Sequence, residues 1–201
     1  MKRLRPDFAL ISEWIAQGSR VLDLGCGEGT LLRHLRDTRG VSGYGLEIDD
    51  ANVVRCLENC VDVIQSDLDD GLADFFDDAS FDYVVMTQTL QAMRRPDRLL
   101  EEMVRVGREG IVTFPNMGYW KNRLQLAVAG HMPVSRALPY TWYDTPNIHL
   151  CTLQDFERLC DEKGLRILQR TVVDAGHREQ ALAAVRPNLL SEIAVYRFTR
   201  A

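Results

Sequence analysis

Nine residues near the N-terminus have the composition of a ligand-binding turn. Residues 21–29 run Val-Leu-Asp-Leu-Gly-Cys-Gly-Glu-Gly, and a helical pattern of leucines follows them. A strand, a glycine turn and a helix in this order bring a ligand against bare backbone at a helix N-terminus. Gly25 and Gly27, with Cys26 between them, can adopt positive φ, and Asp23 adds one fixed carboxylate. We therefore expect a small-molecule site here, although a tight turn without a ligand would give the same pattern.

Two further acids are expected at the ends of neighbouring strands. Glu47 lies 18 residues beyond Gly29 and closes the second expected strand, and Asp67 follows the third. A carboxylate at about the offset of Glu47 can accept both hydroxyls of a ribose. Each acid alone is more often a solvated turn residue. The succession of Asp23, Glu47 and Asp67 at successive strand ends nevertheless predicts a nucleoside site.

The elements that must position these acids alternate along the chain. Apolar runs of strand length recur between segments with a helical period, which predicts an α/β fold with a doubly wound, mostly parallel sheet. We expect one domain over residues 1–201. The expected strands cover residues 20–24, 42–48, 61–65, 81–86, 110–114, 166–173 and 193–199. The expected helices are one capped by Asp7 and ended by Gly18, then 30–36, 51–59, one that begins at Pro96, and one capped by Thr152 that ends at residues 163–164.

One segment breaks this alternation. Residues from about 115 to 148 hold Trp120, Tyr140, Trp142 and Tyr143 together with several prolines, and a short helix is plausible at 121–129. We expect a lid or a partner surface here rather than a second domain. The polar residues 174–190 are expected to form a loop with one helical turn.

Composition excludes several classes of function. The 201 residues are 46% hydrophobic and 26% charged, and the formal net charge of −5 gives no electrostatic reason to bind nucleic acid. No apolar run approaches the length of a membrane span, and no signal-peptide pattern is present. The five cysteines form no CxxC pair and leave an odd one over, which predicts reduced thiols in a cytoplasmic protein and no zinc site.

The motif D-x-G-x-G-x-G resembles motif I of the class I methyltransferases that bind S-adenosylmethionine (SAM), whereas the dinucleotide fingerprint is G-x-G-x-x-G. The resemblance implies a seven-stranded sheet whose last strand is antiparallel. It also implies a site for SAM or S-adenosylhomocysteine, in which an acid after the third strand faces the adenine amino group. Asp67 fits that position, and the Leu68 N–H could reach the ring. The resemblance thus implies cofactor contacts at Asp23, Gly25, Cys26, Gly27, Glu47, Ile48, Asp67 and Leu68.

Several longer segments resemble one particular family within these methyltransferase-like proteins. Residues 44–49, 66–72, 87–93, 114–120 and 138–149 resemble the methionine-biosynthesis family MetW, and the similarity extends from about residue 6 to residue 198. Such a likeness implies a bacterial protein that works beside a homoserine O-acyltransferase, of the acetyl- or succinyl-transferring kind. A homodimer is compatible with the sequence.

The chemistry that the site performs stays open. After the fourth strand, the place of a methyltransferase's acceptor motif holds Thr-Gln-Thr-Leu, which has no titratable base. Gln88 in this run could contact the methionine end of SAM or cap the next helix. His149 is a weak candidate for a catalytic base, and a structural histidine in the lid is the alternative. Two functions therefore remain: a SAM-binding regulatory subunit of the acyltransferase, or a SAM-dependent methyltransferase acting on a small molecule.

Overall fold

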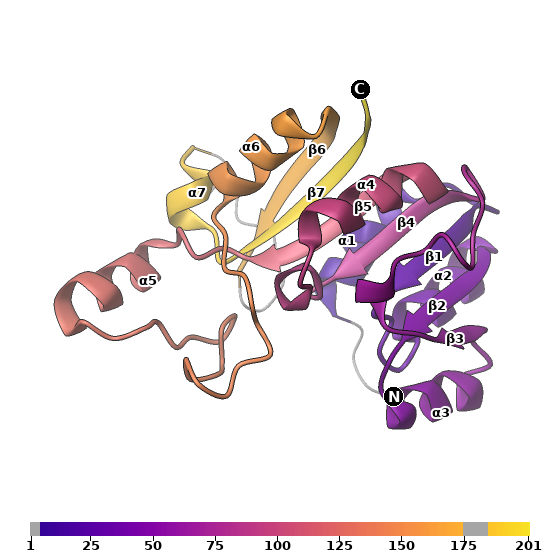
Figure 1. The fold of residues 1–201 in the computed structure, drawn as a ribbon, viewed down its shortest axis with the longest axis horizontal. Coiled ribbons are helices and arrows are strands. Elements are labelled where there is room, and N and C mark those ends of the chain that lie inside the picture. The colour runs from indigo at the N-terminus through magenta and orange to yellow at the C-terminus, as the bar shows by residue number, and fades with distance from the viewer. Residues whose placement is uncertain (1–4, 175–184) are drawn as a thin grey trace.

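The computed structural model describes residues 5–174 and 185–201. They form one seven-stranded sheet with the order β3-β2-β1-β4-β5-β7-β6 (Figure 1). Strands β1 to β5 are parallel, and β7 is antiparallel to both of its neighbours. This confirms the expected doubly wound sheet with an antiparallel last strand. The strands are β1 (Arg20–Leu24), β2 (Ser42–Glu47), β3 (Val63–Gln65), β4 (Phe81–Thr87), β5 (Gly107–Pro115), β6 (Leu165–Val173) and β7 (Ile193–Arg200).

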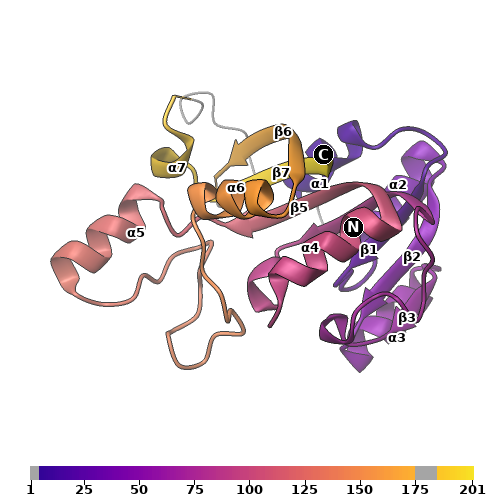
Figure 2. The same ribbon diagram turned by 45° about the horizontal axis from the view of Figure 1, so that its top comes forward.

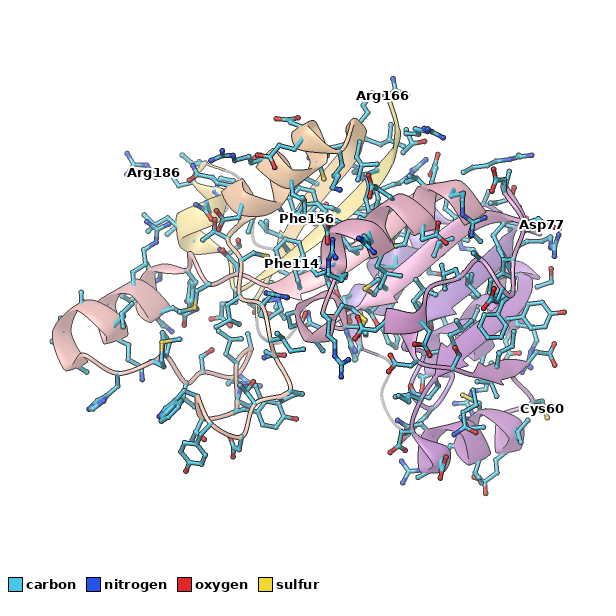
Figure 3. All side chains as sticks on the ribbon, viewed as in Figure 1. Cys60, Asp77, Phe114, Phe156, Arg166 and Arg186 are labelled. Carbon is cyan, nitrogen blue, oxygen red and sulfur yellow. The ribbon has the colours of Figure 1, made fainter. Side chains whose placement is uncertain are left out.

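Helices cover both faces of the sheet because successive side chains of each buried strand point to opposite sides. Met86 contributes to a core that is closed by α4 (Pro96–Val106) and α6 (Leu153–Glu162). Its neighbour Val85 contributes to a second core, closed by α1 (Pro6–Trp14), α2 (Thr30–Arg39) and α3 (Asp50–Glu58). In the first core, Phe114 of β5 and Phe156 of α6 lie close together (Figure 3), with ring centroids 5.0 Å apart.

Some boundaries differ from those expected. The third strand begins at Val63 instead of residue 61, because the Val61 N–H donates to the Cys56 carbonyl at the end of α3. The fifth strand extends to Pro115, since pairing with β7 continues to that residue. Of the polar stretch 174–190, the structure describes α7 (Pro187–Leu190), and residues 175–184 lie outside the described part. Within the described residues, no helix has the length and apolarity that crossing a bilayer requires.

The first helix corrects the expectation that Asp7 is its cap. Arg5 occupies the N-cap position, and the Asp7 side chain is fully buried in the first turn. Arg5 holds it through two hydrogen bonds, Nε to Oδ1 at 3.1 Å and Nη2 to Oδ2 at 2.5 Å. A buried carboxylate needs such a partner, and pairing with Arg5 therefore replaces capping. The helix ends at Trp14, earlier than the expected stop at Gly18.

A long segment between β5 and α6 projects from the sheet in both views (Figures 1 and 2). We call residues 117–150 the arm. It begins with α5 (Trp120–Leu124), continues as the π-helical segment η3 (Gln125–Ala129), and is then largely irregular. The expected helix over 121–129 is therefore present in two parts. The arm returns to the domain at Ala137, which packs against the second core.

The base of the arm is fixed by Asn116, whose side chain is completely buried. Its Oδ1 accepts the Gly118 N–H at 2.9 Å, and its Nδ2 donates to the Ser191 carbonyl at 2.9 Å and to the Asn188 carbonyl at 3.1 Å. One amide thus joins the start of the arm to the segment that precedes β7.

Candidate functional site

The glycine turn joins β1 to α2 and closes over the end of β2. Gly25 has a φ of 69° and Gly27 a φ of 55°, which confirms the expected positive values. The N–H groups of Gly25 and Cys26 donate to the Leu46 carbonyl at 2.9 and 3.0 Å. A Cβ on Gly25 would lie 2.7 Å from Thr89 Oγ1, whereas a Cβ on Gly27 would meet nothing within 4 Å. Gly25 is therefore required by packing, and Gly27 is the glycine beside open space.

Glu47 closes β2 and faces this turn. One carboxylate oxygen accepts the Gly27 N–H at 2.7 Å, and the other accepts the N–H groups of Ile48 and Asp49 at 3.0 Å each. The side chain is 8% exposed. Three backbone donors thus fix the orientation of the carboxylate at the ends of β1 and β2.

This arrangement is unsuited to a phosphate. In phosphate-binding turns the backbone N–H groups point at the anion. Here the N–H groups of Gly25, Cys26 and Gly27 all donate within the protein, and the Gly27 donor already holds a carboxylate. A phosphate at this position would meet the negative charge of Glu47. The geometry favours a ligand with hydroxyl groups or a positive charge.

Asp23 lies in β1 between Gly45 of β2 and Val85 of β4. Its side chain is 1% exposed, and its Oδ1 has no hydrogen-bond partner. Burial raises the pKa of Asp23 to about 7, the Arg5 charge opposes this change in pKa, and Glu47 adds to it. An unpaired buried acceptor is uncommon, and a hydroxyl or ammonium donor of a ligand would satisfy it. Asp23 and Glu47 therefore suit a nucleoside or a cationic ligand.

Cys26 contributes its backbone to this turn rather than a reactive thiol. Its Sγ lies 3.7 Å from Cys56 Sγ, and burial is the main cause that raises the pKa of both thiols. A thiol that stays protonated is a poor nucleophile. The side chain thus gives no support to covalent chemistry at the turn.

The residues expected around an adenine follow β2 and β3, which are adjacent in the sheet. Asp67 Oδ1 accepts the Asp69 N–H at 2.9 Å and caps the 3₁₀ turn η1 (Leu68–Asp70). The Leu68 side chain is buried in the first core, so only its backbone could face a ligand. Ile48 is 61% exposed, although its N–H is bound to Glu47.

Gln88 follows β4 and has a φ of 58°, which is uncommon for a residue other than glycine. Its N–H donates to the Thr113 carbonyl and to Thr113 Oγ1, both at 3.0 Å. The next helical turn, η2 (Leu90–Ala92), has Thr89 at its N-cap and no side-chain cap bond. The structure thus gives no support to Gln88 as a cap.

His149 lies at the end of the arm and is exposed. Its Nε2 is 3.3 Å from the Arg94 carbonyl, and its N–H donates to the Gln91 carbonyl at 2.9 Å. The ring makes the first contact and the backbone makes the second, and both hold the end of the arm to the domain.

Sequence reasoning missed a cavity that lies where the arm returns to the domain, near Ala137. We call it the arm cavity. It has a volume of about 320 Å³, and its polar lining includes Arg5, Gln88, Gln91, Arg136 and Asn147. These residues come from three separate segments of the chain, and the only local signal was the expected position of Gln88 after the fourth strand.

The family model described as methionine biosynthesis protein MetW matches residues 5–198. The chain belongs to the MetW family. A MetW relative, the bifunctional methionine biosynthesis protein MetXA/MetW of Rhodopirellula baltica, is 35% identical over 206 residues. The alignment covers 98% of this chain and 33% of that protein, so the chain spans about a third of the relative's length.

Solved structures show the wider fold to which this MetW protein belongs. An S-adenosylmethionine-dependent methyltransferase from Mesorhizobium loti superposes with a TM-score of 0.69 at 17% identity, covering 97% of this chain and 98% of that one. The [4+2]-cyclase SpnF superposes with a TM-score of 0.66 at 19% identity, covering 96% and 80%. At these identities the likeness concerns the fold alone. The same fold carries a methyltransferase and a cyclase, so the activity must be argued from the site.

Proposed function

We propose that this protein binds SAM, or its demethylated product S-adenosylhomocysteine, and supports or regulates a homoserine O-acyltransferase in methionine biosynthesis. The observation that carries the proposal is the pair formed by the fixed Glu47 carboxylate and the unpaired Asp23 Oδ1 beside the glycine turn. Membership of the MetW family, whose model is described as a methionine biosynthesis protein, supports this choice of pathway.

The nucleoside part of the proposal follows from the donors and acceptors of the site. Glu47 accepts one hydrogen bond on one oxygen and two on the other, so a lone pair remains for a ribose hydroxyl. Asp67 would accept from the adenine amino group, and Gly27 leaves room above the backbone. The positive sulfonium of SAM is compatible with the two acids, whereas a phosphate is not.

The partner follows from the architecture of the relative. In Rhodopirellula baltica a MetXA segment and a MetW segment are parts of one bifunctional protein. We identify the MetXA segment with the homoserine O-acyltransferase that the family resemblance implies. Fusion raises the effective concentration of two modules that act together. We expect the same association for the present chain, in the cytoplasm.

The arm supplies a surface for that contact. Of the large apolar side chains that are exposed within the described residues, eleven of eighteen lie between Trp120 and Leu150. Trp142 and Tyr143 at 74% and 71% exposure are among them, and both views show the arm standing away from the sheet (Figures 1 and 2). Apolar side chains gathered in one projecting segment mark a protein interface. We assign this surface to the acyltransferase.

The test is a homoserine acylation assay with the acyltransferase from the same organism, with and without this protein, at a series of SAM concentrations. The proposal expects a rate that depends on the protein and changes with SAM. A protein that neither binds the acyltransferase nor changes its rate would contradict the accessory role. If SAM binding then persisted in a parallel titration, methyl transfer to a small acceptor would become the better hypothesis.

A further inference from the structure

Gln91, one of the residues that line the arm cavity, has a buried side-chain oxygen without a hydrogen-bond partner. Gln91 is 8% exposed and lines the cavity, and its Nε2 donates to the Gln88 carbonyl at 2.7 Å. Its Oε1 has no hydrogen-bond partner. A buried amide oxygen without a donor costs about 1–3 kcal/mol. Gln91 therefore indicates a ligand that brings an N–H or O–H group.

Two guanidinium groups line the same cavity. Arg136, on the arm, makes no hydrogen bond or ion pair with any residue that the structure describes. Arg5 uses Nε and Nη2 on Asp7, which leaves its Nη1. The residues that line the cavity include no Asp or Glu. Carboxylates and phosphates both match the planar fork of a guanidinium group, and an amino acid combines a carboxylate with the N–H donor that Gln91 lacks.

The remaining lining sets the size and polarity of the ligand. Ala137, Pro139 and Ile193 supply apolar wall, and Asn147 adds a third amide side chain to those of Gln88 and Gln91. The volume of about 320 Å³ suits a small molecule. We propose that the arm cavity binds an α-amino-acid group, with its carboxylate at Arg136 and Arg5 and its ammonium at Gln91 Oε1.

The amino-acid group could come from either of two molecules. The cavity adjoins the glycine turn, because Gln88 lines it while the next residue, Thr89, packs on Gly25. Arg5, in the cavity wall, lowers the pKa of Asp23 through its charge. The amino-acid end of SAM is one source, and this source rests on the proposed function. A free amino acid is the other source and does not depend on it.

Calorimetric titration of the protein distinguishes these sources. The probes are S-adenosylhomocysteine, 5′-methylthioadenosine (the same nucleoside thioether without the amino acid), L-methionine and L-homoserine. The variants are Arg136→Ala, Arg136→Lys and Gln91→Met, which keeps the backbone carbonyl that anchors the arm. Arg166→Ala is the matched control, since Arg166 is exposed on β6 far from the arm (Figure 3).

If the amino-acid group belongs to the nucleoside ligand, Arg136→Ala lowers the affinity for S-adenosylhomocysteine roughly tenfold. Arg136→Lys recovers part of this affinity. The affinity for methylthioadenosine is the same in both variants as in the unmodified protein. If the amino-acid group belongs to a free amino acid, methionine or homoserine binds the unmodified protein but not Arg136→Ala. The affinity for S-adenosylhomocysteine is then unchanged in this variant. Equal affinities in Arg136→Ala, Gln91→Met and Arg166→Ala for all four probes would overturn the inference. Failure of both nucleosides to bind the unmodified protein would contradict the proposed SAM site, and the amino-acid titrations would still decide the role of the cavity.

Discussion

The carboxylate of Glu47 accepts the Gly27 N–H at 2.7 Å, so the end of β2 is hydrogen-bonded to the glycine turn that follows β1. Glu47→Gln would place an amide NH₂ against either the Gly27 N–H or the N–H groups of Ile48 and Asp49. We expect a loss of roughly 1–3 kcal/mol in the free energy of unfolding and at least a tenfold loss of S-adenosylhomocysteine affinity. Chemical denaturation and calorimetry measure the two effects.

Asp67→Asn is the control for this change. The amide oxygen can still accept the Asp69 N–H, so the free energy of unfolding should change by less than about 0.5 kcal/mol. Equal stability of the two variants would show that the bond between Glu47 and Gly27 does not stabilise the turn.

Asp23 makes the stability of the fold depend on pH. The folded protein keeps this proton up to about pH 7, whereas the unfolded chain releases it near the ordinary value of 3.8. At pH values between these two pKa values, folding is therefore accompanied by the uptake of a proton. The free energy of unfolding falls as pH rises from about 4 to 7. Asp23→Asn removes this contribution, and we expect the variant to gain roughly 1–4 kcal/mol relative to the unmodified protein between pH 4 and pH 8. Urea titrations across this pH range give the free energy of unfolding of both proteins. A constant difference between the variant and the unmodified protein would be incompatible with a raised pKa of Asp23.

Asn116 should control how firmly the arm is attached. Asn116→Ala leaves the Gly118 N–H and the Ser191 carbonyl without this buried partner. We expect a loss of roughly 2–4 kcal/mol in the free energy of unfolding and faster proteolysis within residues 117–150. Asn59→Ala, which removes hydrogen bonds at the end of α3, serves as the control and should leave the cleavage rate of the arm unchanged.

Trp142 and Tyr143 test the contact with the acyltransferase. Replacing both with Ala should weaken binding at least tenfold, because large aromatic side chains dominate protein interfaces. Both are mostly exposed, so the free energy of unfolding should change by less than about 0.5 kcal/mol. The paired control is Val54→Ala with Leu57→Ala, exposed apolar residues on α3. Analytical ultracentrifugation of the mixed proteins would count against the assignment if both pairs behaved alike.

The parts of the fold that could be predicted depend on local patterns. The strand before the glycine turn, the N-cap at Thr152, and the positive φ of Gly25 and Gly27 all follow from residues close in sequence. Glu47 was recognised because its offset from the turn reflects the length of one helix and one strand.

The parts that could not be predicted depend on contacts between distant residues. Asp7 has the chemistry of a cap, and only the folded chain shows that Arg5 holds it buried. The arm cavity combines Arg5, Gln88, Gln91 and Arg136, which no spacing rule relates. The left-handed backbone of Gln88 likewise depends on Thr113 of the neighbouring strand.

Gln91 has one further consequence through its backbone. Its carbonyl accepts the N–H groups of Ile148 and His149 at 2.8 and 2.9 Å, while its side chain lines the arm cavity. Any partner that moves the end of the arm must therefore displace a wall of that cavity. Ligand and partner then change each other's affinity by the same factor, as thermodynamic reciprocity requires. The affinity of the acyltransferase for this protein would then depend on whether the cavity is occupied, without any contact between the acyltransferase and the bound molecule.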